Sequence, residues 1–172
     1  MEIGATKAVQ DRLKTTKIEE SKGASLVFCW DTHLTKIKGR NVLFIVNASN
    51  RYTIAMTDIE PRNWNYYTMY ISRVIHGVMQ EMGYSEDQIG QYFKMSGDTT
   101  VTKTHGRKSV GGINRMVMDA QYFGKKLEKE AKYQWELSEY LNRDICQPEG
   151  FDAYGYPSEL FKLDMERLGI AA

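Results

Sequence analysis

The chain has 172 residues, enough for one well-packed domain and too few for two comfortable ones. With 42% hydrophobic and 26% charged residues, the composition excludes extensive disorder. The formal net charge of +1 excludes a whole-molecule attraction to nucleic acid, so any basic contact surface must be local. Because the sequence contains neither a secretory h-region nor an apolar run of roughly 20 residues, we expect a soluble cytoplasmic protein without membrane contact.

The first part of the chain predicts a short edge strand and a helix over residues 1–14, followed by a polar loop. Residues 25–58 then carry the clearest strand signals, "SLVFCWDTHL", "NVLFIVNA" and "YTIAMTDI", separated by turn-forming residues. This pattern predicts a three-stranded antiparallel meander. Alternation along its first strand places Cys29, Asp31 and His33 on one face.

After Pro61 the apolar period becomes helical. We expect helices over about 64–83, 85–95, 109–127, 128–144 and 158–169, with a returning strand at "TTVTKT". The fold class is therefore α+β, a single domain whose antiparallel sheet of about four or five strands has helices packed on one face. Residues 1–126 form its core domain, and residues 127–172 form a helical C-terminal extension through which a homodimer could assemble.

The stretch "TKTHGRKSVGG", residues 102–112, resembles a phosphate-binding turn. A strand end followed by a helix start leaves backbone N–H groups free for an anion, and Lys103, Arg107 and Lys108 add positive charge. Ser109 would contribute a hydroxyl and Arg115 a further cation one turn later. The spacing is not that of a P-loop. In the alternative interpretation, Ser109 only caps the helix and the basic side chains are solvated.

The stretch "WDTH", residues 30–33, is a second candidate site. Asp31 and His33 share a strand face, so the carboxylate could orient the imidazole. If His33 and His105 converge, they could act as general base and general acid on a phosphodiester, with Lys103 or Arg107 stabilising the transition state. The same residues could instead bind a metal ion, or each histidine could be an ordinary structural residue.

The stretch "VNASNRY", residues 46–52, is the third. Asn47 and Arg51 lie at a predicted hairpin tip, where they could bind phosphate, although asparagine there also serves turn formation. Tyr52 could stack on a base or pack into the core.

Together these three stretches resemble an uncharacterised bacterial and phage domain of unknown function that is frequent in mobile-element and plasmid proteins. The similarity covers roughly residues 1–124, through W-x-x-H, V-N-x-x-x-R-Y and a T-K-T-H-x-R-x-S-V-x-G-x-x-N-like motif. This chain has "GRKSV" where the family usually reads NRSV, an insertion of one residue beside Arg107. The resemblance implies that His33, Asn47, Arg51 and the turn at 102–114 share one surface.

These observations predict a phage or mobile-element protein that binds nucleic acid, RNA above all, and could cleave it by metal-independent histidine chemistry. His33, His105 and Asp31 would be catalytic, and no cofactor or metal is expected. Phosphate contacts would come from Lys103, Arg107, Lys108, Ser109, Arg51, Asn47 and Arg115. The alternative is a non-enzymatic inhibitor of a host defence system, similar to an anti-CRISPR protein, or an antitoxin, which binds a host nucleic-acid-handling protein.

Overall fold

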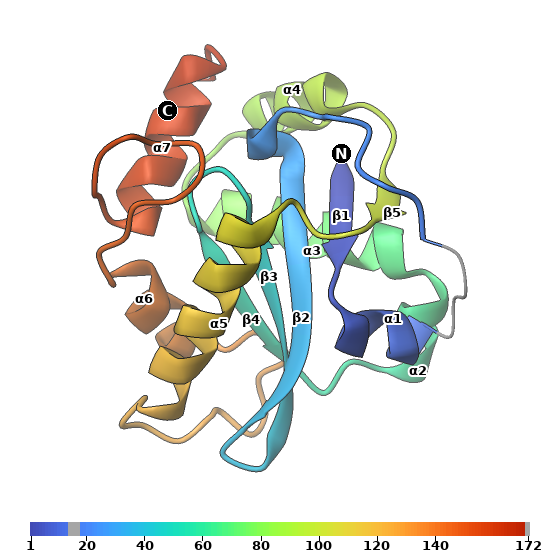
Figure 1. Ribbon diagram of the computed structural model, residues 1–172, viewed down its shortest axis with the longest axis vertical. Coiled ribbons are helices and arrows are strands. Elements are labelled where there is room, and N and C mark those ends of the chain that lie inside the picture. Colours follow the sequence, from blue (N-terminus) through green and yellow to red (C-terminus); the bar gives the residue numbers. More distant parts are fainter. Residues whose placement is uncertain (14–17, 171–172) are drawn as a thin grey trace.

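The computed structural model describes residues 1–13 and 18–170. Its strands form one five-stranded sheet in the order β4-β3-β2-β1-β5 (Figure 1). The strands are β1 Glu2–Ala5, β2 Cys29–Ile37, β3 Arg40–Asn47, β4 Thr53–Thr57 and β5 Thr100–Thr102. The predicted α+β class and the single domain are confirmed, and β2, β3 and β4 form the predicted antiparallel meander.

The sheet is mixed rather than antiparallel throughout. β1 lies parallel to β2 on one side and parallel to β5 on the other. Parallel pairing requires a long connection that returns the chain to the same end of the sheet. The segment between β1 and β2 contains α1 (Lys7–Leu13) and is long enough to do so. The local strand signals predicted the elements but carried no information on these long-range pairings.

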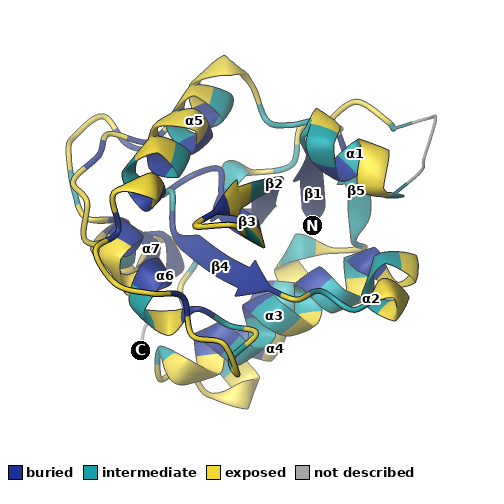
Figure 2. Cartoon of the chain, turned by 90° about the horizontal axis from the view of Figure 1, so that it is seen from below, coloured by how far each residue is buried: buried dark blue, intermediate teal, exposed yellow. Residues whose placement is uncertain are grey.

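Helices cover both faces of the sheet, so the prediction of one covered face was wrong (Figure 2). One face packs against α3 (Tyr67–Glu81), α4 (Glu86–Ser96) and α7 (Pro157–Arg167). The other packs against α5 (Arg107–Gln121) and α6 (Trp135–Asn142). The short helix α2 (Pro61–Asn65) precedes α3. The reason lies in the interior strand β3, because its alternating residues are apolar on both sides and each side must be buried.

The helix predicted from residue 128 begins only at Trp135. Residues 127–134 instead run along the edge of β4, where the Thr57 N–H donates to the Lys132 carbonyl and the Gln134 N–H to that of Ala55. Further along that edge, Ser138 and Asn142 of α6 accept hydrogen bonds from the N–H groups of Ala55 and Thr53. An exposed strand edge is a template for unwanted pairing, and this segment covers it. Tertiary contacts therefore override the local helical pattern.

Within the described ranges, no helix is long and apolar enough to span a membrane.

Candidate functional site

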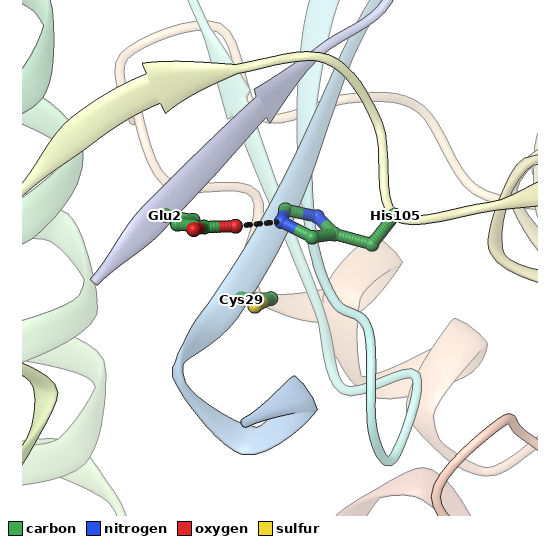
Figure 3. A group of neighbouring side chains, drawn as sticks. All are labelled: Glu2, Cys29 and His105. Carbon is green, nitrogen blue, oxygen red and sulfur yellow. Dashed lines mark hydrogen bonds and ion pairs between the residues drawn. The ribbon is translucent and has the colours of Figure 1, made fainter. Parts of the chain in front are cut away.

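The mixed sheet brings polar side chains from distant parts of the chain onto one face. β1 pairs with β2 so that Glu2 lies beside Cys29 and Gly4 beside Asp31. Strand alternation then directs Glu2, Cys29 and Asp31 to the same side, the side on which α5 packs. The turn between β5 and α5 carries His105 over Glu2 and Cys29 (Figure 3).

Asp31 is fully buried and accepts hydrogen bonds from two residues. Its carboxylate lies 2.7 Å from His105 Nδ1 and 3.2 Å from the His105 backbone nitrogen, and it also accepts from Ser109 Oγ. Gly4 makes room for it, because a Cβ there would lie only 1.8 Å from Asp31 Oδ1. Asp31 is therefore held by the backbone and side chains of the β5–α5 turn.

The other ring nitrogen of His105 faces a second carboxylate. Nε2 lies 3.0 Å from Glu2 Oε2, and the His105 side chain is only 3% exposed. Carboxylates only accept hydrogen bonds, so both ring nitrogens carry a proton. Burial alone would lower the pKa of His105, but the hydrogen bond and charge of Asp31, with a contribution from Cys29, raise it to about 10. The ring is consequently an imidazolium at neutral pH.

Glu2 completes this buried cluster. Burial would raise the pKa of its carboxyl group, but hydrogen bonds from Ser21 Oγ, the Lys22 N–H and His105 lower it below the usual value. The sequence alone offered no sign of its role, since Glu2 and His105 are joined only through the parallel pairing of β1 with β2 and β5.

Asp31 orients His105 rather than His33, contrary to the expectation from "WDTH". The Asp31 carboxylate is occupied by His105 and Ser109 of the β5–α5 turn. His33 Nδ1 instead lies 3.1 Å from Thr6 Oγ1. The two histidines thus have separate partners, and both nitrogens of His105 are occupied. In this arrangement they do not form the predicted acid–base pair.

The burial of His33 predicts that the folded protein is less stable at acid pH. Burial lowers the pKa of His33, whereas a histidine in an unfolded chain titrates near 6.5. Below about pH 6.5 the unfolded chain therefore takes up a proton that the folded protein resists. The free energy of unfolding consequently decreases as the pH is lowered. We expect the free energy of unfolding, measured with urea, to decrease less between about pH 7.5 and about pH 5 in His33→Gln than in the unsubstituted protein. Equal losses in both would contradict the assignment.

A basic pocket lies next to the buried cluster, where the β3–β4 turn meets the start of α5. Its cavity of about 350 Å³ has Arg51, Lys108, Ser109 and Arg115 among its lining residues. Arg51 Nη2 donates to the Gly112 carbonyl at 3.3 Å, and Lys108 Nζ to that of Pro148 at 3.2 Å. The first turn of α5 has no side-chain cap. Cationic side chains therefore converge on a pocket beside the first turns of α5, the end of a helix that favours anions.

Two predicted site residues have structural roles. Asn47 is buried, and its side chain donates to the Val27 carbonyl and accepts from the N–H groups of Ser49 and Asn50. It therefore shapes the turn and does not face the pocket. Ser109 does not cap α5, because the helix begins at Arg107 and places Ser109 in the first turn, directed at Asp31.

The remaining predicted cations differ in their surroundings. Lys103 forms an ion pair with Glu20 and does not line the pocket. Arg115 lines the pocket but also pairs with Asp119 at 3.2 Å. Arg107 is exposed at the start of α5. The convergent positive charge thus comes mainly from Arg51 and Lys108.

A protein-family profile described as Domain of unknown function (DUF6933) matches residues 2–160. The chain belongs to the DUF6933 family. The matched DUF6933 region contains the buried cluster, the basic pocket and α6, and so extends well beyond the 1–124 region of the resemblance. No curated protein and no solved structure matches the chain.

Proposed function

We propose that this DUF6933 protein binds nucleic acid, RNA in the first place, through phosphate contacts at the basic pocket. The observation that carries the proposal is the convergence of Arg51, Lys108 and Arg115 on one cavity beside the uncapped start of α5. Glu149 also lines the cavity, which leaves three cations to one carboxylate. The phage or mobile-element setting implied by the resemblance favours RNA as the carrier of the phosphate.

The proposal is for binding rather than cleavage by the histidine pair. His105 has no free nitrogen, since Asp31 and Glu2 occupy both. A general acid or base must reach the proton that it transfers, directly or through one water. We therefore expect RNA incubated with the protein in EDTA to remain intact on a denaturing gel. Cleavage that His105→Ala abolishes would overturn this part of the proposal.

The pocket predicts weak, salt-dependent RNA binding. Each phosphate contact to a single strand contributes about −0.7 to the slope of log affinity against log salt concentration, so two or three contacts give a slope of about −1.4 to about −2.1. We expect Arg51→Gln and Lys108→Gln each to weaken binding of a labelled single-stranded RNA roughly five- to tenfold, whatever its sequence, and to flatten the slope. Fluorescence anisotropy across a salt series measures both quantities.

Lys94→Gln is the matched control for that experiment. It removes the same charge from an exposed position on α4, which packs on the opposite face of the sheet. Affinity should stay within twofold of the unsubstituted protein. If Lys94→Gln weakens binding as much as Lys108→Gln, the attraction is diffuse and the pocket is not the site.

A protein-binding inhibitor or antitoxin is the second candidate. It is favoured by the net charge of only +1 and by exposed aromatic side chains such as Tyr122, Tyr154 and Tyr66, at 80%, 71% and 65% exposure. Folded protein that leaves RNA unbound at low salt would favour this candidate over the first.

A further inference from the structure

Three side chains in the buried cluster carry metal-binding atoms of different types, and these atoms lie close together. A carboxylate oxygen of Glu2, Sγ of Cys29 and a ring nitrogen of His105 all lie within 4.8 Å of each other (Figure 3). Cys29 is fully buried and Glu2 is 4% exposed. In a tetrahedral zinc site with bonds of about 2.0–2.3 Å, neighbouring donor atoms are about 3.5 Å apart, so small side-chain shifts would suffice.

We propose that Glu2, Cys29 and His105 form a binding site for a single Zn²⁺ ion. The sequence predicted no metal, and the metal alternative that it left open used the two histidines and Asp31. In the structure His33 pairs with Thr6, Asp31 occupies Nδ1 of His105, and the groups next to Nε2 are Glu2 and Cys29 instead. Three protein ligands leave the fourth tetrahedral position to water.

His105 is already oriented for this role. Its Nδ1 is held 2.7 Å from Asp31 Oδ1, so the ring presents Nε2 to Glu2. Metal-binding histidines usually donate their other ring N–H to a carboxylate in this way, which sets the tautomer and the ring orientation. Asp31 is itself held by Ser109. It acts as a positioning residue and not as a ligand.

The charge of the cluster also suits a divalent ion. Without metal, His105 Nε2–H donates to Glu2, and the Cys29 thiol lies 3.4 Å from the Ser25 carbonyl oxygen. Coordination replaces these two protons, one from the imidazolium and one from the thiol, by two positive charges on zinc. The net charge of the buried cluster is therefore unchanged, and no uncompensated charge is created in the interior.

The donor set selects zinc among the common divalent ions. Ca²⁺ and Mg²⁺ prefer oxygen ligands alone, whereas a thiolate, an imidazole and a carboxylate together suit Zn²⁺. The ion would tie β1, the start of β2 and the β5–α5 turn together. Because it binds only the folded chain, it would stabilise the fold and the turn that carries Lys108.

The test uses the full chain, stripped with a chelator and then titrated with Zn²⁺ or Co²⁺. We expect one metal per chain, a near-ultraviolet thiolate-to-cobalt charge-transfer band, and an unfolding constant about 100-fold smaller at a free zinc concentration of 100 times the Kd. Ca²⁺ and Mg²⁺ should produce none of these changes.

Substitutions distinguish zinc binding at this site from nonspecific zinc binding elsewhere on the protein. Cys29→Ser should abolish the charge-transfer band and the zinc-dependent stabilisation, while Cys146→Ser, which alters the other buried cysteine, should retain both. Glu2→Gln should weaken zinc binding at least tenfold. Urea unfolding of each metal-free variant establishes that it folds, so a lost signal is not misfolding. Equal zinc binding by Cys29→Ser and the unsubstituted protein, or no zinc bound by the folded protein, would overturn the proposal.

Discussion

Replacing Asp31 by alanine is expected to lower the free energy of unfolding by about 3–5 kcal/mol. The substitution removes the carboxylate between His105 and Ser109 and leaves a buried imidazolium with only Glu2 as a partner. It also leaves the His105 N–H and the Ser109 hydroxyl without an acceptor. Breaking a buried ion pair is costly because the surviving charge stays out of water. Urea unfolding in the presence of EDTA measures the loss without any contribution from metal.

Asp31→Asn refines this result, since it keeps the shape of the side chain but not its charge. The amide oxygen can still accept from His105 and the NH₂ can donate to Ser109 Oγ, but the negative charge that balances the imidazolium is gone, so most of the loss should persist. Asp11→Ala is the control, because Asp11 pairs with Lys7 on the surface, where both side chains are more than half exposed. Such a pair contributes about 0.5 kcal/mol or less. If Asp31→Ala cost no more than Asp11→Ala, the buried cluster would not exist in solution.

The fold could be predicted from the sequence wherever the signal was local. The meander predicted over 25–58 corresponds to β2, β3 and β4, because β-branched and aromatic runs separated by turn residues specify strands without reference to the rest of the chain. The helix predicted over 85–95 is α4 within one residue at each end, since Ser85 forms the expected capping box with Gln88.

The candidate site was predictable only in part, for a physical reason. Its position near residues 102–112 followed from the change of strand to helix and the basic composition. Its partners did not, because Asp31 and Glu2 are 74 and 103 residues from His105 in the sequence and meet it only through the parallel pairing of β1 with β2 and β5. Arg51 lies beside the turn, where its side chain donates to the Gly112 carbonyl, whereas the sequence could not distinguish Asn47 from an ordinary turn residue.

Phe161→Ala is the second substitution with a large expected effect, about 3–5 kcal/mol in the free energy of unfolding. Phe161 in α7 is 1% exposed, and its ring centroid lies 5.2 Å from that of Tyr52 and 6.2 Å from that of Trp30. These partners belong to the meander, at the other end of the sequence from α7. Truncation would leave a cavity among aromatic rings that the surrounding sheet is too rigid to fill.

The Phe161→Ala substitution also tests whether residues 127–172 fold separately from the sheet. If residues 127–172 were an extension that folds separately, Phe161→Ala would melt α7 alone, and circular dichroism and tryptophan fluorescence would report different transitions. Because Phe161 packs on Trp30 of β2, we expect instead one cooperative transition, shifted to lower urea with an unchanged slope. Leu163→Ala in the same helix, at a side chain that is 44% exposed, should shift the midpoint far less. Two separate transitions in Phe161→Ala would show that the sheet does not depend on α7.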